Sequence, residues 1–410
     1  MGHLSLVVSV RAEFWGRASA LWGAQLGQKA CILVFSFFVG HRLGAEGVGV
    51  MASVLALSWI GGTLAGLGLP DRALFRGAAE DQSAENRRLH GFFLCAVVLV
   101  HAGLWWIAPG LAGTSDPELV LFARGLIVGA GMQCGSALGL GWLRGATAVA
   151  YEVLATASAG LVLVMGALLD LPLGWVWGLS GTCFLVGSIL GNVRLDGIVP
   201  QLPQRTDIES AVRAGVPYLL LGLGSWAVGN IDIILGRLFH GPAELGSLQV
   251  GTMAVRGLGL LPWVAATLML RNLHTVWSQG ERPQPWGWLR NSLFIGLLVA
   301  GLAWVVMPFL AQGHAMPVSA IERSTWASML FAPVLYSVIL LVPLAAQWRL
   351  SGTLKALGMG LMVQFGVGWA AMNEVEVASC VLAAGVGQVV VLMWLMNTLL
   401  SVPKERIKVD

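Results

Sequence analysis

Long apolar segments alternate with short polar breaks along almost the whole chain. A helix needs about 20 mostly apolar residues to cross the hydrocarbon core of a bilayer. Segments of that length predict about twelve membrane-spanning helices. They lie near 19–40, 48–69, 91–111, 119–141, 151–170, 172–192, 214–238, 246–270, 291–311, 325–345, 356–372 and 378–400. The connections are short except for 70–90, 193–213 and 271–290. The pattern therefore predicts an all-α, polytopic membrane protein.

The composition supports this prediction and excludes several classes of protein. Hydrophobic residues make up 57% of the 410 positions and charged residues 11%, against about 25% charged in soluble domains. The mean hydropathy is +0.78. So few charges exclude a disordered chain and a nucleic-acid binder. The five cysteines all lie in apolar segments, which indicates small buried hydrophobic residues rather than a disulfide framework.

The basic residues predict the orientation. With both termini inside, eighteen of the 24 lysines and arginines fall on the inner face, three in or beside the outer loops and three within spans. Short cytoplasmic loops carry such an excess of Lys and Arg. The sequence thus predicts an N-in and C-in protein.

Two similar turns indicate an internal repeat. Residues 44–49 and 241–246 are both Gly-bounded turns that contain a Glu, and they are 197 positions apart. Six predicted spans separate them, so both copies point the same way, as in a parallel repeat about an axis along the membrane normal. Chance recurrence of turns in a chain with 54 glycines is the alternative. The predicted division is an N-terminal six-helix lobe, a cytoplasmic linker, a C-terminal six-helix lobe and a cytoplasmic tail, at 1–192, 193–213, 214–400 and 401–410.

Four charged residues fall within the predicted spans: Lys29, Arg124, Asp232 and Arg256. A charge at the centre of a bilayer costs about 2.5–3.5 kcal/mol even on the lenient insertion scale. These side chains should therefore face a wet cavity or one another. Asp232 can neutralise only one of the three cations, so the sequence predicts a cationic cavity suited to an anionic ligand.

Helical spacing adds polar neighbours to two of these cations. Gln25 lies four residues before Lys29, and Gln249 lies seven before Arg256, so each glutamine shares a helix face with a cation. Ser225 and Asp232 likewise share one face of the seventh span. The polar residues thus lie on the first helices of both lobes. Their polar stripes are expected to meet in a cleft between the lobes.

Several residues within the spans have a second interpretation. Arg124 lies near the outer end of its span and could extend its head group to the interface. Asp232 could pair with Arg237 or with a lobe neighbour, and His101 fits a satisfied interior histidine better than a functional one. Pro217 removes a hydrogen bond inside the seventh span, which predicts a kink or hinge.

Known catalytic motifs are missing from the sequence. No lysine follows a glycine, so the Gly-Lys-Ser/Thr phosphate loop is absent, as are His-Glu-x-x-His and Gly-x-Ser-x-Gly. The predicted outer loops are too short for a catalytic domain. We therefore expect a transporter rather than an enzyme, without cofactor or metal, driven by an ion gradient, the membrane potential or removal of its substrate.

Loose motifs in both lobes resemble a known family. They are Arg42-Leu43-Gly44, Ala45-Glu46-x-x-Gly49, Gly66-Leu67-Gly68-Leu69, Arg213-x-Gly215-x-Pro217, Asn230-Ile231-Asp232, Leu235-Gly236 and the second turn at 241–246. In these features the sequence resembles the polysaccharide exporters, or O-antigen-type flippases, of the multidrug/oligosaccharidyl-lipid/polysaccharide exporter superfamily.

The resemblance implies two six-helix lobes in an inverted V that work by alternating access. It also implies a substrate, an undecaprenyl-pyrophosphate-linked oligosaccharide, carried from the cytoplasmic to the periplasmic leaflet of a bacterial inner membrane. A diphosphate suits a cationic cavity. The residues expected to bind it are Lys29, Arg124, Arg256, Gln25 and Gln249.

Coupling and gating are assigned to Asp232, Asn230 and Pro217. Asp232 would switch ion-pair partners or bind a coupling cation, H⁺ or Na⁺. Further expected partners are membrane lipids and the machinery of glycan polymerisation, but no nucleic acid. Two alternatives stay open: a cation-coupled drug exporter of the same superfamily, and a membrane glycan polymerase or ligase.

Overall fold

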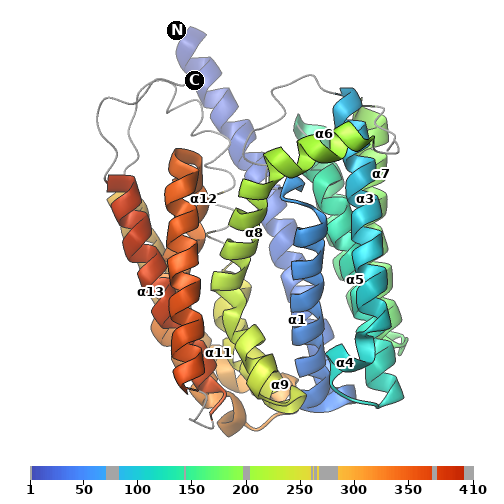
Figure 1. The fold of residues 1–410 in the computed structure, drawn as a ribbon, viewed down its shortest axis with the longest axis vertical. Coiled ribbons are helices and arrows are strands. Elements are labelled where there is room, and N and C mark those ends of the chain that lie inside the picture. The colour runs from blue at the N-terminus through green and yellow to red at the C-terminus, as the bar shows by residue number, and fades with distance from the viewer. Residues whose placement is uncertain are drawn as a thin grey trace.

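The structure, a computed structural model, describes residues 2–70, 83–142, 145–196, 204–259, 262, 266, 285–371 and 376–400. Within these ranges every regular element is a helix (Figure 1). The helices are α1 (Gly2–Ala65), α3 (Ser83–Trp106), α4 (Ala108–Ala112), α5 (Pro117–Trp142), α6 (Gly145–Leu168), α7 (Leu173–Asp196), α8 (Arg205–Phe239), α9 (Pro242–Leu258), α11 (Pro285–Gly313), α12 (Val318–Ala370) and α13 (Ala378–Leu400). The predicted all-α class is confirmed.

Nine helices in the described part of the chain are long and apolar enough to cross a membrane. Two of them, α1 and α12, each contain one non-helical residue, Gly44 (φ 64°, ψ −166°) and Arg349 (φ −152°, ψ 88°). The positive φ at Gly44 suits a residue without a Cβ. Each of these long helices therefore contains two of the predicted spans. The predicted eighth span lies partly outside the described residues, and the count of twelve stays a prediction.

The helices gather into two groups (Figure 1). On one side α5 packs on α7, α7 on α6 and α6 on α1, and on the other side α12 packs on α13, α11 and α8. One buried apolar cluster contains Phe35 and Leu126 of the first group and extends to Met307 of the second. Another, with Leu341 and Val391, lies within the second group. We call these groups the N-lobe and the C-lobe.

The predicted linker is partly helical. Helix α7 continues to Asp196, and α8 already begins at Arg205, inside the predicted linker 193–213. The predicted tail 401–410 lies outside the described residues. The lobe boundaries stay a prediction.

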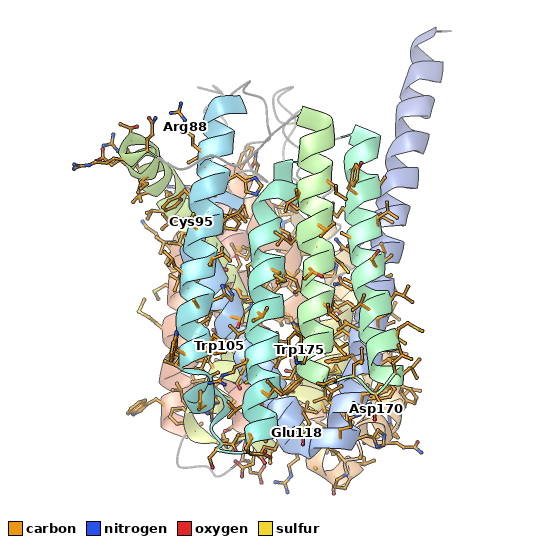
Figure 2. All side chains as sticks on the ribbon, turned by 90° about the vertical axis from the view of Figure 1, so that its right-hand side faces the viewer. Arg88, Cys95, Trp105, Glu118, Asp170 and Trp175 are labelled. Carbon is orange, nitrogen blue, oxygen red and sulfur yellow. The ribbon has the colours of Figure 1, made fainter. Side chains whose placement is uncertain are left out.

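The start of α1 and the end of α13 lie at the same end of the bundle (Figure 1), which we call the terminal end. Figure 2 places Arg88 at this end and Glu118 and Asp170 at the opposite end. Trp105 and Trp175 lie a short way inside that opposite end, where an aromatic belt marks the edge of the hydrocarbon. The N-in and C-in orientation stays a prediction.

Candidate functional site: a cavity between the lobes

The repeated turns meet at the end opposite the termini. A Cβ on Gly49 would lie 1.8 Å from the Pro242 carbonyl oxygen, and one on Gly246 would lie 2.0 Å from the Ala45 carbonyl oxygen. The offset of 197 maps Gly49 onto Gly246 and Ala45 onto Pro242. The two contacts are thus reciprocal, as expected where a pseudo-twofold axis passes between the lobes. We call this end the closed end.

Two further contacts between the lobes close the same end. A Cβ on Gly40 would lie 2.8 Å from the His314 backbone. At the equivalent position in the C-lobe, Arg237 donates hydrogen bonds from Nη2 to the carbonyl oxygens of Gly110 (3.3 Å) and Leu111 (3.2 Å). Each lobe therefore uses the outer end of its first span to contact the other lobe.

His314 forms a buried hydrogen bond between the lobes. Its Nε2 lies 3.0 Å from Ser36 Oγ, and its Nδ1 lies 2.8 Å from the Leu310 carbonyl oxygen. The Phe37 ring packs edge-on against the His314 ring, with 4.8 Å between the two ring centroids. Burial lowers the pKa of His314 below the ordinary 6.5; the Leu310 hydrogen bond opposes this shift, and His41 adds to it. The closed end therefore favours neutral His314.

This shift predicts that acid opens the closed end. Above its ordinary pKa His314 is neutral in both states, but as the pH falls through about 6.5 an exposed His314 binds a proton that the buried one resists. Spin labels at Gly110 and Ala243, in a variant without native cysteines, should move apart between about pH 7.5 and about pH 5.5. His314→Gln should remove most of this response, and His41→Ala should retain most of it. An undiminished response in His314→Gln would contradict the assignment.

A cavity of about 790 Å³ lies between the lobes, with Met253 and Leu310 toward the closed end and Leu26 and Ser136 toward the terminal end. Six described helices of both lobes contribute to it: α1, α5, α7, α8, α9 and α11. Its polar and tryptophan lining residues are Gln28, Lys29, Trp59, Gln133, Ser136, Trp177, Trp226, Asn230, Gln249 and Arg256.

Four of the sequence-predicted residues line this cavity: Lys29, Asn230, Gln249 and Arg256. The Lys29 side chain is exposed to it. Within the part of the chain that the structure describes, Lys29 has neither an acidic partner nor a hydrogen bond. The Gln249 Oε1 atom is buried there without a hydrogen-bond partner among the described residues. The cavity thus offers one free cation, and Gln249 keeps an unused acceptor buried in its wall.

Arg256 is neutralised by Asp232. Its Nη2 contacts both carboxylate oxygens of Asp232, whose side chain is 1% exposed. Arg256 is 18% exposed and lines both the large cavity and a small pocket beside Asp232. Of the two partners considered from the sequence, Arg237 or a lobe neighbour, Asp232 thus takes the lobe neighbour Arg256, and Arg237 bonds to the N-lobe at the closed end.

Besides Asp232, Arg124 and two other predicted residues lie outside the cavity lining. The Arg124 Cζ atom lies 4.4 Å from the centroid of the Trp105 ring. This cation–π contact holds the Arg124 charge within the N-lobe. Gln25 is not among the lining residues, although its Oε1 is buried without a described partner. Pro217 lies inside α8, which remains helical through it. The predicted two free cations are thus reduced to one, Lys29, in the described lining.

The comparisons rest on solved structures alone. No family model and no curated protein matches the sequence. An outward-facing multidrug resistance MATE family transporter of the MOP superfamily superposes with a TM-score of 0.61 at 15% identity, covering 94% of each chain. Lipid II flippase MurJ, in an inward closed conformation, gives 0.65 at 11%, covering 94% of this chain and 88% of its own. The chain shares the fold of these solved structures. A third structure with this fold, a MOP transporter from Pyrococcus furiosus, gives 0.56 at 16% identity and covers 93% and 95%.

The solved structures that share this MOP fold are transporters and a flippase, not enzymes. Sequence reasoning missed several residues that line the cavity, above all Trp59 and Trp226. The position of these two tryptophans in the sequence could have indicated a cavity role. Both lie well inside predicted spans, whereas tryptophans of membrane proteins concentrate at span ends. Gln133 and Ser136 of α5 also line the cavity and were missed.

Proposed function

We propose that the protein is a flippase for an undecaprenyl-pyrophosphate-linked oligosaccharide, carried by alternating access from the cytoplasmic to the periplasmic leaflet of a bacterial inner membrane. The observation that carries the proposal is Lys29, a cation without a described partner in an otherwise mostly apolar cavity. An uncompensated charge at membrane depth is costly. A diphosphate would compensate it with charge-assisted hydrogen bonds.

The neighbouring polar groups support the same ligand. Arg256 keeps one nitrogen, Nη1, buried without a described hydrogen-bond partner, even though Asp232 balances its charge. Gln249 and Asn230 add amide groups to the lining, which can bind phosphate oxygens or sugar hydroxyls. With the termini in the cytoplasm, as the basic loops favour, the closed end would be periplasmic.

The nearest alternative is a cation-coupled drug exporter. Two of the structures with this fold are multidrug resistance MATE family transporters. A cavity for cationic drugs would carry free acids, yet no Asp or Glu occurs among the described lining residues. Drug-resistance assays on a deletion strain separate the two functions. A membrane glycan polymerase or ligase would instead lengthen or transfer glycans when the purified protein is incubated with lipid-linked oligosaccharide.

Replacing Lys29 by alanine should block export. The free cation is lost, so surface glycan should fall by about tenfold or more, the value of one or two charge-assisted hydrogen bonds. The lipid-linked precursor should accumulate inside, as measured by extraction of labelled lipids. Lys29→Arg should retain much of the export, and Lys355→Ala, at an exposed position of α12, should behave as wild type. Normal export by a well-expressed Lys29→Ala variant would refute the assignment.

The proposal also includes a coupling cation and a protein partner. Asp232 would release Arg256 when it binds a proton or another coupling cation, with Asn230 lining the adjacent cavity and Pro217 as a bending point of α8. A glycan polymerase would take the exported product. Uptake of Na⁺ or H⁺ by proteoliposomes that hold the lipid-linked substrate tests the coupling.

A further inference from the structure

The cavity is asymmetric at positions that the repeat makes equivalent. The offset of 197 maps Lys29 onto Trp226 and Trp59 onto Arg256, and all four side chains line the cavity. Each lobe thus contributes one cation and one tryptophan, but on different spans. The N-lobe has its cation on the first span and its tryptophan on the second, and the C-lobe has the reverse order.

This exchange collects like residues on the same side of the cavity. Lys29 lies on the first half of α1, which contacts α9 through Ser36 Oγ and Met253 Sδ, 3.9 Å apart. Arg256 lies on α9, so the two cations come from neighbouring helices. A symmetric arrangement would have placed one cation and one tryptophan on each side.

The two tryptophans come from the other pair of neighbouring helices. Trp59 lies on the second half of α1, which ends against α8: a Cβ on Gly68 would lie 2.2 Å from the Leu219 backbone nitrogen. Trp226 lies on α8. We call the side formed by Lys29 and Arg256 the cationic side, and the side formed by Trp59 and Trp226 the aromatic side.

The aromatic side has surface free for a ligand and a polar group beside it. Trp59 is 38% exposed, and Trp226 is half-buried. One turn after Trp226, Asn230 donates its Nδ2 to the Trp226 carbonyl oxygen (2.9 Å) and lines the cavity. Its amide oxygen remains an acceptor for a hydroxyl group. Flat apolar rings beside an amide acceptor match a sugar ring, which has an apolar C–H face and a polar hydroxyl rim.

We propose that the aromatic side is a sugar-binding subsite, in which Trp59 and Trp226 stack on the proximal sugars of the glycan while the cationic side holds the diphosphate. The inference rests on the function proposed above and adds a division of labour within the cavity. Selectivity between glycans would then depend on the aromatic side, and affinity for the lipid diphosphate on the cationic side.

Binding of two ligands to the purified full-length protein tests the subsite. The ligands are undecaprenyl diphosphate and the same lipid carrying an oligosaccharide, and dissociation constants are measured in nanodiscs. Trp59→Ala and Trp226→Ala should each weaken binding of the glycosylated lipid about tenfold, the usual value of one stacking contact. Binding of the bare diphosphate should change less than about twofold. Trp175→Ala, at a position 66% exposed on the outside of the bundle, is the matched control.

Other outcomes would contradict either the sugar-binding subsite or the proposed function. Equal weakening of both ligands, or no weakening of either, would overturn the sugar subsite, as would equal wild-type affinity for the glycosylated and bare lipids. Trp59→Phe and Trp226→Phe keep a flat ring and should retain most of the affinity, which separates stacking from a folding defect. If the wild-type protein binds neither lipid, the proposed function itself fails. A preference for a planar aromatic cation over both lipids would favour a drug exporter.

Discussion

Replacing Gly49 by valine is expected to abolish transport. Even a Cβ at this position would lie 1.8 Å from the Pro242 carbonyl oxygen, and that oxygen belongs to backbone at the start of α9, which cannot rotate away. The lobes would then be held apart at the closed end. Because alternating access requires both states, we expect export to fall by about a hundredfold or more, the effect of disfavouring one state by ~3 kcal/mol or more.

The same reasoning applies to Gly246, whose Cβ would meet the Ala45 carbonyl oxygen. Spin labels at Gly110 and Ala243 should show a single long separation in Gly49→Val and in Gly246→Val. Gly103→Val is the control, since Gly103 has open space around its Cβ position and should export normally. Normal export by Gly49→Val would show that the two lobes need not meet at this crossing.

Replacing Asp232 by alanine is expected to destabilise the protein strongly. Asp232 is buried and contacts Arg256 with both carboxylate oxygens. Removing one partner of a buried ion pair leaves an uncompensated charge and costs about 3–5 kcal/mol. The variant should show a lower unfolding temperature in detergent and a lower yield of folded protein.

A double variant separates stability from transport. Asp232→Asn with Arg256→Gln replaces the charged pair by two amides and should recover most of the lost thermal stability. Export should stay impaired if Arg256 also contacts the substrate, because a neutral amide cannot replace its guanidinium. Unchanged stability in Asp232→Ala would contradict the structural role of the pair. Full export by the stable double variant would contradict its part in transport.

The sequence allowed the spans and the repeat to be predicted because both depend on local patterns. Apolar length defines a membrane helix, and the turns at 44–49 and 241–246 are similar in sequence. Lys29 and Arg256 could be placed in the cavity because a charge in mid-span has few other positions. Each of these inferences depends on sequence patterns alone and needs no knowledge of how the helices pack.

Partner choice could not be predicted in the same way. Asp232 lies five residues before Arg237 and 24 before Arg256, and only the packing of α8 on α9 selects the more distant arginine. No polar stripe runs through Arg124 along its span, so the sequence does not indicate whether this side chain meets the cavity. The contact with Trp105 decides its position. The relation of Trp59 and Trp226 to the two cations depends on the offset of the repeat together with the cavity lining, and the lining is known only from the structure.

The ion pair between Asp232 and Arg256 also has an electrical consequence. Among the described lining residues, it leaves Lys29 as the uncompensated charge, so the empty cavity carries about +1 and the cavity loaded with a dianionic diphosphate about −1. An inside-negative membrane potential is worth about 2.3 kcal/mol per charge per 100 mV. With the orientation and the diphosphate substrate proposed above, that field would favour outward movement of the loaded, anionic carrier and inward return of the empty, cationic one. One lysine would thus make both halves of the cycle electrogenic in the productive direction.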